Sequence, residues 1–521
     1  MSLIKTASMI VVLTLVGRLL GFFRTIYVNS LYGTSGVADA FNTAAQIPLT
    51  LYLIVPGAIN AVLIPTMRGL LEKDDRTGTL YQRMFTIVLI VFALLSALGI
   101  VFARPIAMLL GAQDVTYPLA SDPGVTINAL DLTTELLRWM WPSAIFIGLA
   151  GLWSSVNNAH QHFFTPTLAT VANGAVVIIA MYLLVPVYGA LGLAIATTLG
   201  YLAAMLPMLV TLRQFDYRHR LAFGWKQDQS LREMGERVIP ILIGAAVAQA
   251  TSLLEKNFGN GLGEGKVTAL TNANQLVQMP MAIFVGAFTL PLFPLLASYV
   301  KRGEMERMKE TLQKGLSYLL ILLLPVSVGF IVYAEPIIRL AFNRGAFDEH
   351  SVMLTAWALP FYGLALYGLA ARDLITRAFY ALENTRTPVI VGAIGIGVYA
   401  LANYALIPLL DHGGIALGTA ISAFSQAALL YLLLWRKIGT LIQRSFLWTV
   451  GKTLLGCALM AAVLLGVDPW LSALPLWLYM LLGISGAALV YFAALALLRE
   501  PLVSELLMRV AKKGAKRADS P

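Results

Sequence analysis

The chain has 521 residues, of which 58% are hydrophobic and only 12% are charged, and its formal net charge is +10. A water-soluble fold has too little interior to bury that much apolar surface, so the composition excludes a soluble enzyme and indicates a protein of the lipid bilayer. The single cysteine, Cys457, lies in an apolar stretch. Disulfides and thiolate metal sites are therefore excluded.

Apolar stretches recur along the whole sequence at the length of about 20 residues that a helix needs to cross the hydrocarbon core. They predict an all-α membrane protein with fourteen transmembrane helices, at 6–31, 36–66, 84–103, 133–158, 163–187, 190–213, 235–258, 266–299, 312–333, 351–382, 387–409, 414–436, 447–467 and 476–498. The first stretch is longer than a secretory signal and is not followed by a small-residue cleavage site, so we expect a retained helix. No soluble domain is expected.

Basic residues gather after the even-numbered helices, at Arg68, Lys73, Arg76, Arg83, Arg213, Arg218, Arg220, Lys226, Lys301, Arg302, Arg307, Lys309, Arg436, Lys437 and Arg444. The long loop after the third helix instead carries Asp114, Asp122 and Asp131. Because cytoplasmic loops are enriched in lysine and arginine, both termini are predicted to be cytoplasmic. The remaining positive charge lies in a tail at 501–521, where Lys512, Lys513, Lys516 and Arg517 can rest on anionic headgroups, and it does not indicate nucleic-acid binding.

The two halves of the sequence repeat one another. Pro48 recurs as Pro280, 232 positions later, and the Arg-Pro-Ile at 104–106 recurs as Glu-Pro-Ile at 335–337, 231 later. The Thr-Pro at 165–166 recurs at 387–388, and Pro186 recurs as Pro408, both 222 later. The repeat predicts an N-terminal lobe at 1–220 (helices 1–6), a C-terminal lobe at 221–440 (helices 7–12) and two added helices at 441–500. Six helices per copy give both lobes the same orientation, so we expect a central cavity and alternating access.

Charges inside spanning helices are costly and point to function. The segment 17–24, GRLLGFFR, places Arg18 and Arg24 six residues and about 9 Å apart along the first helix. Two guanidiniums without an adjacent carboxylate suit a diphosphate. The alternative is structural, with Arg24 reaching the membrane interface and Arg18 paired with Asp39.

Helix 7 carries adjacent charges, Glu255 and Lys256, midway down an apolar stretch. They are interpreted as an ion pair, as a substrate contact by Lys256, or as a proton or sodium site at Glu255. Arg372 and Asp373 lie in helix 10, and Arg377 is interpreted as an anchor at its cytoplasmic end.

The sequence contains no phosphate-cradling Walker loop, so no cofactor is expected, and energy would come from a sodium or proton gradient, the membrane potential or the substrate gradient itself. His160 and His162 have a spacing that can bind metal, but no third ligand is evident, and a solvated turn is the simpler interpretation.

Three blocks of sequence resemble the MurJ (MviN) family of lipid II flippases. They are GRLLGFFR (17–24) with ADAF (38–41) and Ile-Pro (47–48), then EKNF (255–258) with LGEG (262–265), ALTNANQL (269–276) and QMP (278–280), and finally TRAFYALENTRTP (376–388). The resemblance implies the fold of the multidrug/oligosaccharidyl-lipid/polysaccharide exporters. It also implies a protein of the bacterial inner membrane that exports the undecaprenyl-diphosphate-linked precursor of peptidoglycan, with membrane lipids and cell-wall synthesis proteins as further partners.

Carried over residue by residue, the resemblance implies that Arg18, Arg24, Asp39 and Lys256 bind substrate and that Glu255 is the ion-coupling candidate. Two arginines common in the family are absent, at Tyr52 and Gln275. The chain is then a divergent orthologue whose Lys256 replaces a missing charge, or a flippase for another undecaprenyl-linked glycan. An ion-coupled multidrug antiporter of the same superfamily would instead need cavity carboxylates, and a scaffold for cell-wall enzymes would not need buried arginines.

Overall fold

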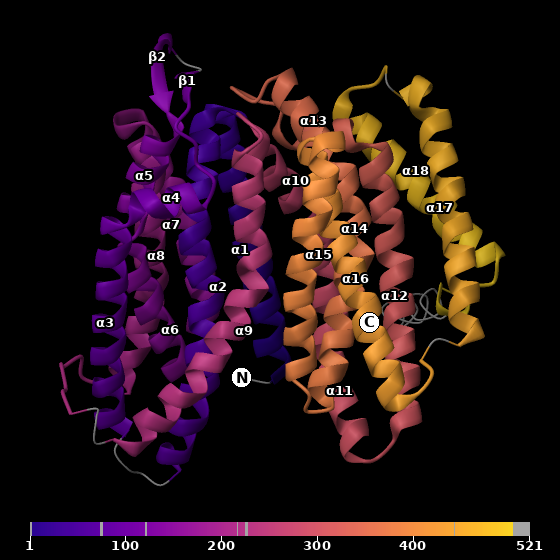
Figure 1. The fold of residues 1–521 in the computed structure, drawn as a ribbon. Helices are drawn as coiled ribbons and strands as arrows, with labels where there is room; N and C mark the ends of the chain where they lie inside the picture. Colours follow the sequence, from indigo (N-terminus) through magenta and orange to yellow (C-terminus); the bar gives the residue numbers. More distant parts are fainter. Residues whose placement is uncertain are drawn as a thin grey trace, which may run out of the picture. The chain divides into compact units, whose positions relative to one another are not determined.

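A computed structural model describes residues 3–72, 77–119, 122–215, 217–224, 228–441, 443–471 and 473–503 (Figure 1). The chain forms two compact units. Unit 1 comprises Met1–Thr268 with Arg344–Asp348, and unit 2 comprises Ala269–Asn343 with Glu349–Pro521. The basic positions Lys73, Arg76 and Lys226, and the tail residues Lys512, Lys513, Lys516 and Arg517, lie outside the described residues.

Unit 1 consists of long apolar helices with one short hairpin. Its elements are α1 (Leu3–Tyr32), α2 (Gly36–Leu71), α3 (Thr77–Val101), α4 (Ala103–Leu109), β1 (Thr116–Leu119), β2 (Asp122–Asn128), α5 (Ala129–Met140), α6 (Ser143–Ala159), α7 (Phe164–Tyr188), α8 (Ala190–Gln214) and α9 (Gln229–Asn260). The break between α5 and α6 falls at Pro142, which has no N–H to donate to the preceding turn.

Unit 2 is helical throughout its described residues. It contains α10 (Lys266–Pro280, whose first turn belongs to unit 1), a π-helical turn η2 (Met281–Val285), α11 (Gly286–Lys301), α12 (Met305–Val332), α13 (Ala334–Phe342), α14 (Glu349–Ala381), α15 (Arg386–Leu410), α16 (His412–Ile438), α17 (Arg444–Leu471) and α18 (Leu476–Leu497).

Thirteen helical segments of the described chain are long and apolar enough to cross a membrane. They coincide with thirteen of the fourteen predicted stretches, so the all-α membrane fold is confirmed and the count of fourteen is not. The exception is 266–299, where η2 interrupts the helix and leaves α10 and α11 with 15 and 16 residues. A π-turn carries no hydropathy signal, because it changes hydrogen bonding rather than composition.

The internal repeat is visible in backbone conformation. Gly189 joins α7 to α8 at φ 56° and ψ −133°, and Asp411, 222 positions later, joins α15 to α16 at φ 55° and ψ −138°. A Cβ on Gly192 would come 2.7 Å from the Leu184 backbone, and one on Gly414 would come 2.7 Å from the Leu406 backbone. Each helical hairpin therefore closes through the same tight turn.

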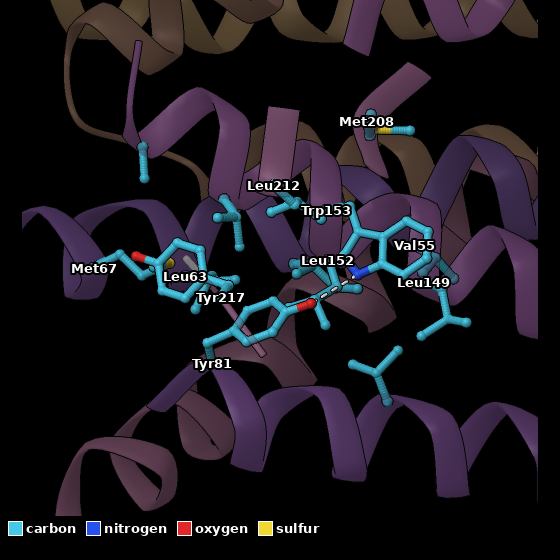
Figure 2. Packing of buried hydrophobic residues seen from close by; sticks show 14 of the residues in the cluster. Val55, Leu63, Met67, Tyr81, Leu149, Leu152, Trp153, Met208, Leu212 and Tyr217 are labelled. Atoms are coloured by element: carbon cyan, nitrogen blue, oxygen red, sulfur yellow. Dashed lines mark hydrogen bonds between the residues drawn. The ribbon is translucent and has the colours of Figure 1, made fainter. Parts of the chain in front are cut away.

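A hydrophobic cluster from α2, α3, α6 and α8 fills one end of unit 1 (Figure 2). Trp153 Nε1 donates a 3.1 Å hydrogen bond to Tyr81 Oη, which also lies 2.7 Å from His219 Nδ1. Tyr217, from the segment after α8, packs on the Tyr81 ring with centroids 4.8 Å apart. The connection from α8 to α9 is thereby tied to the helix ends.

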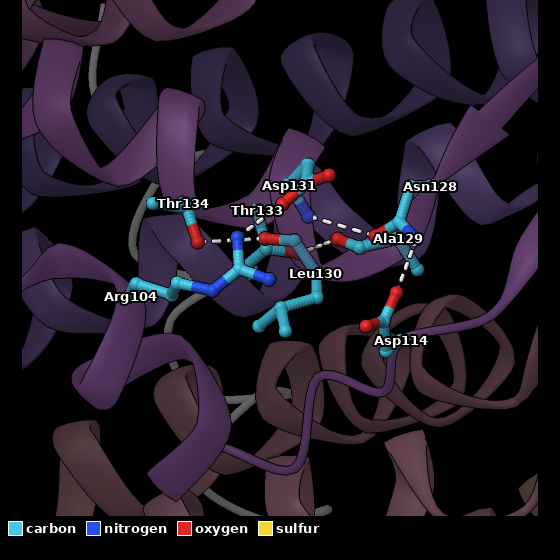
Figure 3. A network of polar contacts seen from close by, with 8 residues as sticks. All are labelled: Arg104, Asp114, Asn128, Ala129, Leu130, Asp131, Thr133 and Thr134. Carbon is cyan, nitrogen blue, oxygen red and sulfur yellow. Dashed lines mark hydrogen bonds and ion pairs between the residues drawn. The ribbon is translucent and has the colours of Figure 1, made fainter.

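The opposite end of unit 1 carries the β1–β2 hairpin (Figure 1) and a polar network (Figure 3). Arg104 forms an ion pair with Asp131. Asp131 N donates to Asn128 Oδ1, which caps α5, and Asn128 Nδ2 donates to Asp114. The network joins α4, the hairpin strand and α5.

The two C-terminal helices are part of unit 2. α17 and α18 pack on each other and on α12, where Tyr491 Oη donates a 2.7 Å hydrogen bond to Ile321 O. α9 belongs to unit 1 and packs on α2, although the repeat would begin a second lobe there. The two six-helix lobes with a cavity between them stay a prediction.

Candidate functional site

The two arginines of α1 are positioned by close packing of α1 on α7. A Cβ on Gly17 would come 3.0 Å from Thr170 Oγ1, and one on Gly174 would come 2.8 Å from Leu20 Cβ. Arg24 lies seven residues, about two turns, beyond Gly17 and so shares its face of the helix. It is half-buried and within electrostatic range of Tyr201 on α8.

Arg18 is exposed, and neither it nor Arg24 forms an ion pair or a hydrogen bond with a described residue. The alternative pairing of Arg18 with Asp39 is absent from the described part of the chain, because the Asp39 carboxylate is bonded elsewhere. Two guanidiniums in a membrane-spanning helix are thus left with donors for an external anion.

The Asp39 carboxylate caps the first turn of α10. Its Oδ2 accepts from Gly265 N at 2.5 Å, and its Oδ1 accepts from Thr268 N and from Thr268 Oγ1, both at 2.7 Å. The side chain is 7% exposed. A carboxylate at a helix N-terminus satisfies backbone donors that have no partner within the helix, so Asp39 fixes where α10 starts.

Glu264 makes the reciprocal bond, and the sequence did not reveal it. Gly36 N, at the first residue of α2, donates to Glu264 Oε1 at 2.7 Å. The N-terminal ends of α2 and α10 are therefore each capped by a carboxylate that lies at the start of the other helix. The motif LGEG at 262–265 was the sequence signal that could have revealed this contact. Gly263 at φ 101° and Gly265 at φ 84° turn the chain so that Glu264 faces α2.

Glu255 and Lys256 are buried, at 7% and 5% exposure, in the last two turns of α9. They lie near the C-terminal end of α9, which ends at Asn260, as they do in the predicted helix at 235–258. Lys256 interacts electrostatically first with Glu255 and then with Asp39. The three side chains Asp39, Glu255 and Lys256 therefore form one charge cluster, which we call the α9 cluster.

Two asparagines anchor the same end of α9. Asn257 Nδ2 donates to Leu109 O at 2.9 Å, and Asn260 Nδ2 donates to Leu110 O at 2.8 Å. Asn260 also exchanges hydrogen bonds with Thr43 of α2. These bonds hold the α9 cluster against α2 and α4.

The positions that lack the family arginines lie in different units. Tyr52 of α2 packs its ring against Tyr201, with centroids 5.7 Å apart, beside Arg24. Gln275 is half-buried in α10, in unit 2. Of the remaining intramembrane charges, Arg372 pairs with its neighbour Asp373 at 2.8 Å within α14.

His160 and His162 pack in an aromatic cluster. His160 stacks on Phe215 with centroids 4.0 Å apart, and its Nε2 lies 3.0 Å from Tyr217 Oη. Burial, and then His162, lowers the pKa of His160, while burial and Arg213 lower the pKa of His219. Groups of three or more potential metal ligands are absent from the described residues.

A family model described as lipid II flippase MurJ matches residues 28–483. The lipid II flippase MurJ of Burkholderia cenocepacia is 31% identical over 92% of this chain and 94% of that protein. A solved structure titled as lipid II flippase MurJ in an inward closed conformation has a TM-score of 0.76 at 21% identity, covering 95% of this chain and 99% of the other.

An inward-facing multidrug resistance transporter of the MATE family, in the MOP superfamily, has a TM-score of 0.69 at 13% identity, over 82% of this chain and 95% of the other. These structural likenesses confirm the expected exporter fold. The family model and the sequence relative cover nearly the whole chain. The chain belongs to the lipid II flippase MurJ family.

Proposed function

We propose that the protein flips lipid II, the undecaprenyl-diphosphate-linked precursor of peptidoglycan, from the inner to the outer leaflet by alternating access. It acts as a transporter in the bacterial inner membrane, with both termini in the cytoplasm. Family membership supports the substrate, and the basic loops support the orientation. Sodium, protons or the membrane potential would drive the cycle.

The observation that carries the proposal is the pair of unpartnered guanidiniums in α1. An arginine in a spanning helix normally pairs with an acid or reaches the interface. Arg18 and Arg24 instead keep their donors free of described partners. A diphosphate offers oxygens for two forked guanidiniums, which strengthens binding where water is excluded.

In this proposal Asp39 positions the start of α10 and does not bind the substrate. Its oxygens already accept three hydrogen bonds, and a carboxylate repels a diphosphate. Lys256 keeps its predicted role as a substrate contact, with Asp39 and Glu255 balancing its charge in the empty state. We also propose that the protein contacts cell-wall synthesis proteins.

The test is complementation of a strain depleted of its own lipid II flippase. Arg18→Ala and Arg24→Ala should each abolish growth at wild-type membrane abundance, and lysine at either position should rescue only in part because it lacks the bidentate fork. Arg232→Ala is the matched control, since Arg232 is 80% exposed and pairs with Glu236 one turn further along α9. Lipid II exposed at the outer face is the direct readout.

Full activity of the Arg18→Ala/Arg24→Ala double variant would overturn the assignment of the diphosphate site. Failure of the wild-type chain to complement, together with gradient-dependent resistance to cationic drugs, would replace lipid II by the antiporter activity. Complementation of a strain lacking a different undecaprenyl-linked glycan flippase would indicate the paralogous substrate.

A further inference from the structure

Five residues between α13 and α14 belong to a different unit from the two helices that flank them. Arg344–Asp348 is part of unit 1, whereas α13 and α14 are part of unit 2. We call these five residues the strap. The chain thus leaves unit 2, contacts unit 1 and returns within a very short connection, and the reason lies in the contacts that the strap makes.

The strap docks backbone to backbone on the last turn of α1. Ala346 N donates a 2.8 Å hydrogen bond to Ser30 O. Ser30 lies two residues before the end of α1, where carbonyl oxygens have no donor within the helix. Gly345 has a φ of 64°, and a Cβ there would come 2.2 Å from Ser30 O. A side chain at position 345 would therefore keep the strap off α1.

One side chain adds to this contact. Phe347 is 0% exposed, and the other four residues of the strap are exposed. The strap is therefore held by one hydrogen bond and one buried ring. A contact of this size keeps a segment in place, but it can open without unfolding the helices around it.

The base of the strap is fixed within unit 2. Arg339 Nη2 of α13 donates to Glu349 Oε2, at the start of α14, at 2.7 Å. Asn343 Nδ2 donates to the other oxygen of the same carboxylate at 3.2 Å. These bonds close the connection at its base and leave little slack in it. A displacement of α13 and α14 therefore pulls on the strap.

The helix end that the strap holds carries an arginine of the proposed diphosphate site. Ser30 is six residues beyond Arg24, about 9 Å along α1. Close packing on α7 holds α1 at Gly17, on the other side of Arg24. Arg24 lies between these two attachments, so docking or release of the strap changes the constraint on the stretch of helix that presents its guanidinium.

We propose that the strap couples α13 and α14 to the diphosphate site by positioning the end of α1. Docked on Ser30, it holds Arg24 in place for the substrate, and it detaches once in each flipping cycle, when α13 and α14 move relative to α1. Gly345 and Ala346 are positioning residues, because they act through Arg24 and do not touch the substrate. This inference rests on the proposed flipping by alternating access.

Hydrogen exchange of the full-length protein in lipid nanodiscs tests the contact itself. The Ala346 amide should exchange about tenfold faster in Gly345→Ala than in the wild type, because the added Cβ removes its hydrogen bond. Gly303→Ala is the matched control. Gly303 has a φ of 72°, and a Cβ there would meet no atom within 4 Å, so this variant has the same left-handed strain without the clash. It should leave the exchange of Ala346 unchanged.

A weakened hold on Arg24 predicts a second effect of Gly345→Ala. The lipid II concentration at half-maximal flipping should rise about fivefold relative to Gly303→Ala, as expected when one charge-assisted contact is weakened. The thermal unfolding midpoints of the two variants should lie close together, because the strap opens without unfolding α1 or α14. A loop with a merely structural role would change the midpoint and leave the half-maximal concentration as it is.

A reversible cross-link tests whether the strap must detach. Ser30→Cys and Ala346→Cys are introduced together in a Cys457→Ser background, since Cys457 is the only native cysteine. A short bis-methanethiosulfonate should join the pair, because the backbones of the two residues are hydrogen-bonded. Lipid II exposure at the outer face should then fall at least about tenfold, as expected when a required opening is blocked, and return when reductant is added. Arg232→Cys/Glu236→Cys, one exposed turn of α9, is the matched control and should flip normally when cross-linked.

Three results would overturn the role of the strap. They are equal Ala346 exchange in Gly345→Ala and Gly303→Ala, failure of the cysteine pair to cross-link, and undiminished flipping by cross-linked protein. Exchange and cross-linking are measured without substrate, so they report on the strap whether or not lipid II is flipped. Failure of the wild type to flip lipid II would count against the proposed function instead.

Discussion

Lys256 places a buried ammonium group in a membrane-spanning helix, and two carboxylates interact with it electrostatically. Glu255 precedes it in α9, and Asp39 reaches it from α2. Removing one member of such a cluster strands another without compensation, which costs more than the cluster contributes. We therefore expect Glu255 to act as an ion-pair partner rather than as an ion sensor.

We expect Glu255→Gln to destabilise the purified protein by about 3 kcal/mol, because it leaves Lys256 with one carboxylate. Glu255→Gln/Lys256→Met should recover most of that loss, since it removes the ammonium and its neighbouring carboxylate together and leaves Asp39 with its three hydrogen bonds. Thermal unfolding in detergent measures the change in stability of each variant. Gln229→Ala, at the exposed first residue of α9, is the control and should unfold like the wild type.

Ion sensing would give a different result. Both variants would unfold like the wild type, and lipid II exposure would stop responding when sodium, proton or potential gradients are collapsed in turn. Under the ion-pair interpretation Glu255→Gln, which keeps Lys256, retains its gradient dependence.

Whether a site residue and its contacts could be predicted from the sequence depends on the kind of group that it contacts. Arg18 and Arg24 could be identified because a charged residue within an apolar stretch can be recognised in the sequence itself. The partners of Asp39 were not, because backbone N–H groups of Gly265 and Thr268 leave no mark in composition and lie more than 220 positions away. Glu264 was part of a recognised motif without an assigned role.

At the scale of elements, the two repeat turns share a backbone conformation but have different residues at the positive-φ position. Gly189 and Asp411 share a backbone conformation that glycine adopts freely and other residues adopt under strain. Hydropathy located α7, α8, α15 and α16 within a few residues. It could not show that their connections match.

We predict that Asp411→Gly raises the free energy of unfolding by about 1 kcal/mol, by relieving strain at positive φ. Asp411→Ala separates the side chain from the backbone effect and should give no gain, because alanine keeps the strain. The converse change, Gly189→Asp, should lower stability by a similar amount. A gain from alanine equal to that from glycine would assign the effect to the carboxylate instead.

At the scale of the whole molecule, sequence predicted thirteen of the spans and the repeat, because both rest on periodic composition. The division into units was harder to anticipate. It depends on which helix packs on which, and the packing of α9 on α2 through Asn260 and Thr43 assigns α9 to unit 1.

The proposed orientation gives an expectation for cysteine labelling in a Cys457→Ser background, where Cys457 is buried and the only native cysteine. Gln113→Cys, exposed beside the hairpin, should react with a membrane-impermeant maleimide in intact spheroplasts. Glu306→Cys, exposed beside the basic residues after α11, should react only after lysis. Reaction of both, or the reverse pattern, would contradict the orientation.

The π-helical turn at Met281–Val285 has a mechanical consequence. A π-turn accommodates one residue more than the α-helix around it, so it is a movable defect in the hydrogen-bond ladder. Shifting it by one turn changes the facing of the intervening side chains by about 100° while both helix ends keep their places. Part of the surface of the segment 266–301 can therefore turn by about 100° and shift by about 1.5 Å along the helix axis, using only local exchange of backbone hydrogen bonds.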